Sequence, residues 1–99
     1  MSPGGEGATG WLVYVVRCAD GSLYTGIARD LDRRVREHNE DDRLAARYTR
    51  CRRPVMLVHA EPCANRAAAA AREHAIKRMA KPAKEAMILC SICAGVRGA

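Results

Sequence analysis

One glutamate of this sequence lies where an unpaired carboxylate would be costly. Residues 65–80 predict a long, alanine-rich helix that begins after Asn65. At about 100° per residue, one side of this helix carries the apolar side chains of Ala69, Ile76 and Ala80. Glu73 falls within that stripe, where a carboxylate is unfavourable unless it is paired or binds a cation. An ion pair with Lys77, one turn further on, contributes only a few tenths of a kcal/mol. We therefore favour a functional carboxylate at Glu73, with the ion pair as the structural alternative.

Arg34 and His38 are candidates for chemistry on a shorter helix. Asp30 suits the N-cap of this helix, which is expected to end near Asn39. The packed side of the helix carries Leu31 and Val35. The residues predicted to point away from it are Arg33, Arg36 and Glu37. Arg34 and His38 lie at the edge of the packed side, where a solvated charge would not need to be. The alternative is a surface helix whose basic residues only keep the protein soluble.

Two tyrosines lie on a β-hairpin that residues 11–27 predict. The turn around Gly21 decides how they are placed. A two-residue turn puts Tyr14 and Tyr24 on opposite faces of the sheet, whereas a three-residue loop with a left-handed Gly21 puts both on one face. The second arrangement also places Gly26 opposite Tyr14. Gly21 suits the three-residue loop, and half-buried sheet aromatics without a chemical role are the structural alternative.

A small sheet and its flanking helices must position these side chains. Strands are predicted over 11–17, 23–27 and 55–60, and helices over 30–39, 65–80 and 82–92. The segment 40–54 is charged and predicts no regular element. The order β-β-α-β-α-α predicts an α+β fold, in which helices flank a small three-stranded antiparallel sheet. We expect one domain over 11–92, a disordered tail over 1–10 and a flexible tail over 93–99.

The composition narrows the class of protein further. The chain has 99 residues, of which 48% are hydrophobic and 28% charged, and this balance is typical of one globular domain. A net charge of +6 favours nucleic acid or another anionic partner. No run of about 18 apolar residues occurs, so no membrane span is expected. Scattered cysteines without a secretory signal favour a cytoplasmic protein with free thiols. Cys90 and Cys93 have the spacing of half a zinc site, and two apolar side chains at a helix end are the favoured interpretation.

Four segments occur in an order that resembles the GIY-YIG nuclease family. They are Leu12-Val13-Tyr14, Tyr24-Thr25-Gly26, the stretch from Asp30 to Asn39, and Ala71-Arg72-Glu73-His74-Ala75-Ile76-Lys77. The sequence looks most like the small stand-alone, single-domain bacterial members, related to the nuclease domain of the excinuclease C subunit. Leu12 stands where the first motif has glycine, and Thr25 stands where the second usually has isoleucine. Neither position needs its side chain for proton transfer.

The resemblance implies that the protein is a metal-dependent endonuclease that hydrolyses phosphodiester bonds. The catalytic residues that it implies are Tyr14, Tyr24, Arg34, His38 and Glu73. Glu73 would hold Mg²⁺ or Mn²⁺, which stabilises the leaving oxygen, and Arg34 would hold a non-bridging phosphate oxygen. Tyr14 is the family-like general base, with His38 lowering its pKa or relaying the proton. His38 as the base itself is equally natural chemically, and the two assignments stay open.

The resemblance and the charge together predict a nucleic-acid partner, with DNA favoured, and a role in DNA repair or processing. The residues predicted to contact nucleic acid are Gly26, Arg29, Arg33, Arg50, Arg52, Arg53 and Lys77. Gly26 is included because a glycine inside a strand leaves a notch that a ligand can approach. The substrate is expected to be selected by its structure, such as a flap, nick or branch. The alternative function is a nucleic-acid-binding module on the same fold, with no activity or with activity that depends on a partner.

Overall fold

Three antiparallel strands form the centre of the fold. The computed structural model of the protein describes residues 10–98, with side chains up to Ser91, so most of the expected tail over 1–10 lies outside the described residues. The strands are β1 (Leu12–Arg17), β2 (Leu23–Ala28) and β3 (Met56–Pro62), in the order β2-β1-β3. This sheet and its helices confirm the predicted α+β fold class. The central strand is β1, and β2 and β3 form the two edges.

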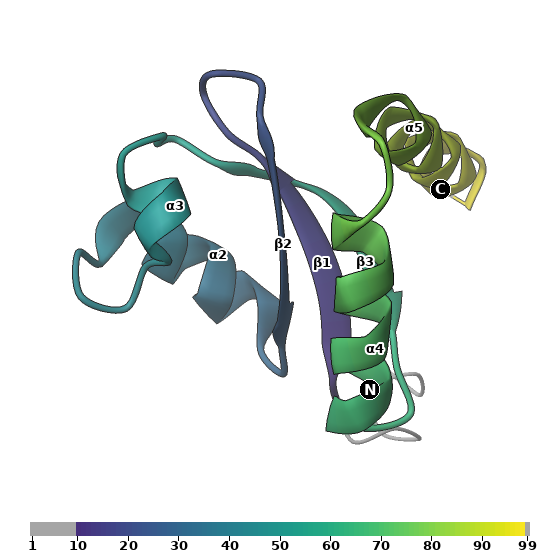
Figure 1. Cartoon of the computed structure of the whole chain (residues 1–99), viewed down its shortest axis with the longest axis horizontal. Helices are drawn as coiled ribbons and strands as arrows, with labels where there is room; N and C mark the ends of the chain where they lie inside the picture. The colour runs from purple at the N-terminus through teal and green to yellow at the C-terminus, as the bar shows by residue number, and fades with distance from the viewer. Residues whose placement is uncertain (1–9, 99) are drawn as a thin grey trace.

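Helices cover both faces of this sheet (Figure 1). The helices α2 (Leu31–Glu40) and α3 (Arg47–Arg50) lie on one side of it, and α4 (Arg66–Lys77) and α5 (Lys81–Gly98) lie on the other. The side chains of Asp30 and Asn65 accept hydrogen bonds from the backbone N–H groups three residues on and so cap α2 and α4. Both caps were predicted from the sequence.

Three predicted element boundaries were wrong. The long helix α4 ends at Lys77, so Ala80 lies beyond it and is exposed instead of joining the apolar stripe. The last helix was expected over 82–92 and to end before Gly95, but α5 begins at Lys81 and extends to Gly98. The segment 40–54 was expected to be irregular, yet it contains α3. Thr49 of this short helix is completely buried, and Ala45, just before the helix, is buried as well.

The hairpin has the three-residue loop. Tyr14 pairs with Gly26 and Arg17 pairs with Leu23, and the N–H of Cys18 donates to the carbonyl of Ser22 at 2.8 Å. Gly21 has φ +85°, the left-handed conformation that this loop requires and that glycine adopts without steric cost. Tyr14 and Tyr24 therefore lie on the same face of the sheet, as the three-residue alternative predicts.

The two faces of the sheet bury separate apolar clusters. On the α2 side, Tyr14, Val16 and Val55 are buried, with Leu31 and Val35 of α2 packed against them. The cluster on the other side consists of Val13, Val15, Ile76 and Ile88, which bring α4 and α5 onto the sheet. Because side chains alternate along β1, this one strand contributes to both clusters. The central strand thus determines which helix meets which face.

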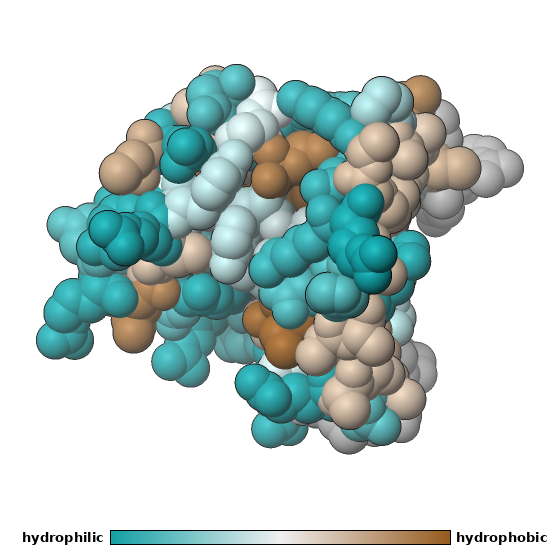
Figure 2. All heavy atoms as spheres, in the orientation of Figure 1, coloured by the Kyte–Doolittle hydropathy of each residue, from teal (hydrophilic) through white to brown (hydrophobic). Residues whose placement is uncertain are grey.

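The surface is mainly polar on the α2 and α3 side of the face drawn in Figure 2, and apolar side chains gather toward α4 and α5. Among the described residues, no helix combines the length and the apolar character that crossing a membrane requires. Exposed charges lie on both sides of the sheet, among them Arg33 and Arg36 on α2 and Arg66 and Lys81 on α4 and α5.

Candidate active site

The ring of Tyr14 lies over Gly26, and this position brings its hydroxyl to His38. A Cβ atom added at Gly26 would lie 2.6 Å from the Tyr14 Oη and 2.8 Å from its Cζ, far inside contact distance. The predicted open notch at Gly26 was therefore wrong, because the ring of Tyr14 fills that space. Tyr14 begins on the central strand, and the missing side chain on β2 allows its hydroxyl to extend over the edge strand.

His38 lies directly behind the Tyr14 hydroxyl. The Tyr14 Oη and the His38 Nε2 are 2.7 Å apart, and the His38 ring is completely buried. On the other side of the ring, Nδ1 is 2.7 Å from the Oγ1 of Thr49, which is also completely buried. His38 is thus enclosed between a tyrosine and a threonine, and it has no exposed surface with which to meet water.

Two groups beside His38 Nδ1 affect which ring nitrogen carries the proton: the hydroxyl of Thr49 at 2.7 Å, and the N–H of Ala46, which donates to Nδ1 at 3.5 Å and favours the tautomer with the proton on Nε2. The Oγ1 of Thr49 lies 3.0 Å from the carbonyl oxygen of Ala46, so it donates its proton either there or to His38 Nδ1. In the first case His38 Nδ1 carries the ring proton and Nε2 accepts from the Tyr14 hydroxyl. In the second case Nε2 carries the ring proton and donates to the Tyr14 oxygen, which is the arrangement that stabilises a phenolate. Both states keep His38 neutral.

Tyr24 is held in the same cluster by two aromatic neighbours. Its ring meets His38 edge-on, with ring centroids 5.3 Å apart. On another side it stacks with Tyr48 of α3 at 5.9 Å, with 24° between the ring planes. The guanidinium of Arg52 lies 4.0 Å over the Tyr48 ring and closes the stack. Tyr24 therefore lies between the buried His38 and a partly exposed aromatic stack.

Glu73 approaches this cluster from the opposite face of the sheet. The Nζ of Lys77 lies 5.7 Å from the centre of the Tyr24 ring and 3.2 Å from a carboxylate oxygen of Glu73. Because α4 packs on the face opposite α2, the two side chains meet Tyr24 around the edge strand β2. The Glu73 side chain is 24% exposed, so it lies at the boundary of the packed stripe and not inside it. The structural alternative, a pair with Lys77, is present in the structure.

Arg34 has two acceptors beside the cluster. Its Nη1 donates to the carboxylate of Glu37 at 3.0 Å and to the carbonyl oxygen of Leu44 at 2.6 Å. Glu37 was predicted to point away, but it is half-buried because both Arg33 and Arg34 pair with it. The carboxylate thus holds Arg34 in place next to Tyr14.

Burial changes the pKa values of both central groups. Burial raises the pKa of Tyr14 to about 12, and the nearby Arg34 guanidinium acts against this rise, whereas Tyr24 and Glu73 add to it. Burial also lowers the pKa of His38 to about 4, and the positive charge of Arg34 adds to this effect. His38 is therefore neutral at physiological pH. The charges of Arg34 and Glu73 both act on the Tyr14 hydroxyl, so the structure brings together the predicted catalytic residues.

The donor set fits a divalent cation held by one protein ligand. Among the residues that the structure describes, no three His, Cys, Asp or Glu side chains form a group that could hold a metal ion. Glu73 is a half-buried carboxylate with exposed surface, and hard oxygen ligands of this kind suit Mg²⁺. Mg²⁺ is commonly bound through one or two carboxylates, with water and substrate phosphate completing its coordination. The half-buried Glu73 is therefore the residue of the predicted site that would hold such a cation.

The predicted nucleic-acid contacts do not share one environment. Arg29, Arg33 and Arg50 are exposed, and the side chain of Arg33 is 67% exposed although it pairs with Glu37. Arg53 points inward: its Nε donates to the carbonyl oxygen of His38 at 2.7 Å, and its Nη1 donates to Asp42. Arg53 thus supports the backbone of α2. Arg52 forms an ion pair with Asp20 and lies over the Tyr48 ring. Lys77 is paired with Glu73.

Two residues of the cluster were missed by sequence reasoning. Thr49 and Tyr48 lie on α3, in the segment predicted to be irregular. Two small uncharged residues, Ala45 and Ala46, interrupt the charged segment just before α3 and are the weak signal for a packed turn there. A single turn is too short for periodicity to stand out against its charged neighbours.

Comparisons with known proteins place this geometry in a family. Residues 10–86 match the family described as the GIY-YIG catalytic domain. A UPF0213 protein of Desulfotalea psychrophila is 51% identical over 81 residues, which cover 82% of this chain and 73% of that protein. A UPF0213 protein of Haloquadratum walsbyi is 52% identical over 73 residues, which cover 74% of this chain and 80% of that protein.

A solved structure agrees with the fold. The solution NMR structure of a UPF0213 protein from Bacillus halodurans is similar with a TM-score of 0.52 and 34% identity, over 81% of this chain and 83% of that chain. The family match covers the strands, the buried tyrosine–histidine pair and the helix that carries Glu73. This chain belongs to the GIY-YIG family of nuclease domains.

Proposed function

We propose that this protein is a metal-dependent endonuclease that hydrolyses phosphodiester bonds in DNA. The observation that carries the proposal is the Tyr14 hydroxyl, which lies 2.7 Å from a neutral, buried His38 and within the electrostatic influence of both Arg34 and Glu73. A proton acceptor, a phosphate-binding cation and a metal-binding carboxylate are the groups that this hydrolysis needs. The family supports the reaction class, and the geometry supports the assignment of roles.

Tyr14 is the general base in this proposal. Tyr14 and His38 are both buried, but of the two assignments open at the level of sequence we favour Tyr14, because both ring nitrogens of His38 already have protein partners, the Tyr14 Oη and the Thr49 Oγ1. In the tautomer with a proton on Nε2, His38 donates to the Tyr14 oxygen and so stabilises the phenolate. The Arg34 guanidinium also stabilises the phenolate: it lowers the pKa of Tyr14, whereas burial raises it. The Tyr14 phenolate then takes a proton from water as the water attacks phosphorus.

Arg34 and Glu73 act on the charge of the phosphate. The guanidinium of Arg34 donates to a non-bridging oxygen as negative charge builds up there. Glu73 holds the divalent cation, which when bound supplies Lewis-acid stabilisation of the leaving oxygen. Lys77 must give up part of its contact with Glu73 when the cation binds, and it then remains available for a phosphate. Tyr24 orients water or phosphate through its hydroxyl.

Replacing the carboxylate without changing its shape tests this proposal. Glu73→Gln should abolish cleavage of a panel of nicked, branched and single-stranded DNAs in Mg²⁺ or Mn²⁺, while DNA binding stays intact or tightens slightly. Binding should persist because a negative charge near phosphate has been removed. Glu40→Gln, which changes an exposed carboxylate at the end of α2, is the matched control and should cleave normally. If Glu73→Gln cleaves at the wild-type rate per folded molecule, Glu73 is only a partner for Lys77 and the nuclease assignment loses its central residue.

One observation favours a second function. The carboxylate of Glu73 already has a cationic partner in Lys77, at 3.2 Å, as a purely structural pair would. A nucleic-acid-binding module on the same fold, with no activity or with activity that depends on a partner, would keep this pair. DNA binding by the wild-type protein without cleavage in either metal would favour this second function.

A further inference from the structure

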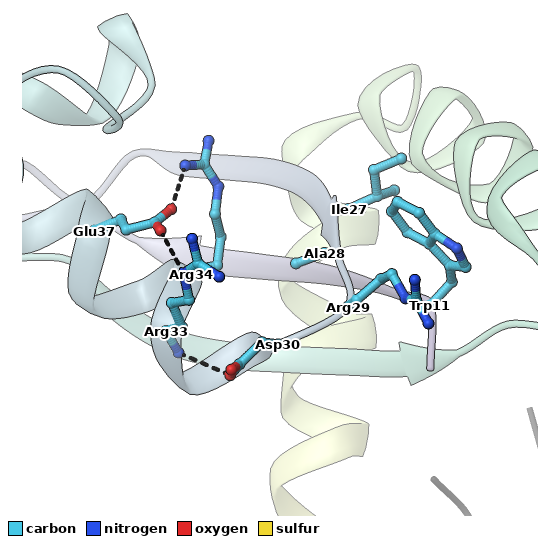
Figure 3. Close-up of a pocket in the computed structure, with 8 residues that line it drawn as sticks. All are labelled: Trp11, Ile27, Ala28, Arg29, Asp30, Arg33, Arg34 and Glu37. Carbon is cyan, nitrogen blue, oxygen red and sulfur yellow. Dashed lines mark hydrogen bonds and ion pairs between the residues drawn. The ribbon is translucent and has the colours of Figure 1, made fainter. Parts of the chain in front are cut away.

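A pocket of about 300 Å³ lies beside the proposed catalytic cluster, and none of the proposed chemistry uses most of it. Trp11 and Arg29 lie at one end of this pocket, and Arg33, Arg34 and Glu37 of α2 lie at the other (Figure 3). Between the two ends, Ile27 and Ala28 of β2 contribute to its wall. Its volume is at the lower end of the range for small-ligand pockets. The pocket is therefore large enough for one flat ring and its immediate substituents.

Trp11 is an aromatic platform between two cations. The guanidinium of Arg29 lies 5.8 Å from the centre of the Trp11 ring, and the guanidinium of Arg66 lies 5.6 Å from it. By contrast, Arg52 lies 4.0 Å over Tyr48, which is close stacking. Trp11 is only half-buried, so part of this residue stays accessible beside the two guanidinium groups. An indole with cations at its borders combines a stacking surface with phosphate ligands.

The pocket borders the proposed site of cleavage through one residue, Arg34. Arg34 lines it and also lowers the pKa of the Tyr14 hydroxyl, so one guanidinium borders both places. Around the pocket and its platform, four arginines face two carboxylates: Arg29, Arg33, Arg34 and Arg66 against Asp30 and Glu37. This excess of positive charge suits a segment of nucleic-acid backbone. A strand whose phosphate meets Arg34 would therefore place a neighbouring nucleotide near Trp11.

We propose that this pocket binds an unpaired nucleotide of the DNA strand that is to be cut, with its base stacked on Trp11 and its phosphates held by Arg29 and Arg66. The inference rests on the proposed function and names its substrate class: DNA with a single-stranded segment next to the scissile phosphate. A base in an intact duplex is already stacked on both faces and cannot reach a tryptophan without being flipped out. Phosphate contacts alone would not distinguish the two forms of DNA.

The fluorescence of Trp11 provides a direct test, because Trp11 is the one tryptophan of the chain. The full-length protein carrying Glu73→Gln, in buffer without divalent metal, is titrated with a short single-stranded oligodeoxythymidylate. The same variant is titrated with a blunt duplex of equal charge. Quenching of the emission by the single strand and little change with the duplex is the expected result. Equal responses to both, or no response to saturating single strand, would overturn the proposal.

Substitution of the platform separates stacking from charge. Trp11→Leu should weaken binding of the single strand about five- to hundredfold, the range for loss of one stacked base, and should leave duplex binding almost unchanged. Trp11→Phe keeps an aromatic face and should lose less. Arg29→Gln and Arg66→Gln should each weaken binding more than Arg43→Gln, which removes an equal charge from an exposed position outside the pocket. Thermal melting checks that each variant is folded. A Trp11→Leu variant that melts normally and binds single strands like wild type would refute the stacking role.

The failure of this inference can be told apart from the failure of the proposed function. Trp11 quenching by single strands without any cleavage by the wild-type protein would remove the nuclease proposal and keep the nucleotide pocket. Cleavage of blunt duplex at the same rate as flapped DNA, unaffected by Trp11→Leu, would keep the nuclease proposal and remove the pocket.

Discussion

At the scale of single residues, the central feature is a tyrosine hydroxyl placed between groups of opposite effect. Burial raises the pKa of Tyr14 and so disfavours its phenolate, whereas the charge of Arg34 lowers this pKa and favours the phenolate. His38 supplies a hydrogen bond whose direction depends on the proton of Thr49. A neutral histidine can stabilise a phenolate by donating to it without itself carrying a charge into the core. In the role proposed for Tyr14, the Arg34 charge and this hydrogen bond are the two effects that offset the cost of the buried phenolate.

The dependence of cleavage on pH should distinguish Tyr14 from His38 as the base. Below its pKa of about 12, the phenolate fraction of Tyr14 rises about tenfold per pH unit. Single-turnover cleavage should therefore rise with pH across about pH 6–9, with no plateau near neutrality. His38, with its pKa near 4, is already unprotonated throughout this range, so a base at His38 would give a flat profile. Tyr14→Phe should abolish the rise, and a flat profile in the wild type would assign the base to His38.

The glycine under Tyr14 should be essential for activity although it has no side chain of its own. Gly26→Ala introduces a Cβ 2.6 Å from the Tyr14 Oη, so the ring must move. A displacement of about 1 Å can reduce the rate of a positioned reaction about 100-fold. Initial rates on the preferred DNA, normalised to folded protein, would measure this loss.

Gly21→Ala is the matched control for this substitution. Nothing lies within 4 Å of a Cβ at Gly21, but its φ of +85° makes alanine strained there. The Gly21→Ala substitution should lower the free energy of unfolding by about 1 kcal/mol and leave the rate of DNA cleavage per folded molecule unchanged. Equal rates for Gly26→Ala and wild type would show that the position of the Tyr14 hydroxyl does not limit cleavage.

At the scale of elements, the short helix α3 contributes more to the site than its four residues suggest. It contributes Thr49 to the back of His38 and the ring of Tyr48 to the side of Tyr24. The helix α2 carries Arg34 and His38 on neighbouring turns, and α4 brings Glu73 around the edge strand. Three helices from two faces thus converge on β2. The shortest of them, α3, contacts the His38 ring through Thr49.

Removing the hydroxyl of Thr49 should affect both stability and the tautomer of His38. Thr49→Val keeps the shape of this completely buried side chain but leaves His38 Nδ1 without its partner at 2.7 Å. Loss of a buried hydrogen-bond partner costs about 1–3 kcal/mol, measurable by chemical denaturation. Thr49→Ser keeps the hydroxyl and should preserve the ¹⁵N chemical shifts of the His38 ring, which report its tautomer. If Thr49→Val leaves those shifts unchanged, Thr49 packs against His38 without orienting it.

At the scale of the whole molecule, the charge and the small size act together. The chain carries a net charge of +6 on 99 residues. Several of its arginines are paired internally, as in the pair of Arg53 with Asp42 and the pair of Arg17 with Glu85. The exposed cations, which include Arg36, Arg43 and Arg50, are the ones left for a polyanion. Binding should therefore depend on a limited number of phosphate contacts.

Affinity for DNA should fall steeply with salt. About 4–6 phosphate contacts would give a slope of log K against log salt of roughly −4 to −5 on duplex DNA, which is a loss of about 10²–10³-fold between about 50 and 200 mM. Fluorescence anisotropy with a labelled duplex and the Glu73→Gln variant measures this slope without cleavage. Affinity that does not change over this range would contradict a binding surface made of exposed arginines.

The sequence by itself determined the elements that local physics controls. Asp30 and Asn65 mark where two helices begin because their side chains satisfy backbone N–H groups within one turn. Gly21 indicates the hairpin loop because a left-handed residue is needed there, and that loop in turn puts Tyr14 and Tyr24 on one face. These are interactions between residues near in sequence, so their pattern can be recognised without knowing the rest of the chain.

Only the tertiary structure decided how distant segments meet. The turn of α3 is too short to be stable alone, and it forms because Thr49 is buried against His38. The notch at Gly26 could not be assigned to Tyr14 until both strands and the ring were in place. Glu73 and Tyr24 come from helices and strands on different layers and approach each other only around the β2 edge. The physical reason is that packing between elements depends on the shapes of all of them at once, whereas a local pattern specifies each element alone.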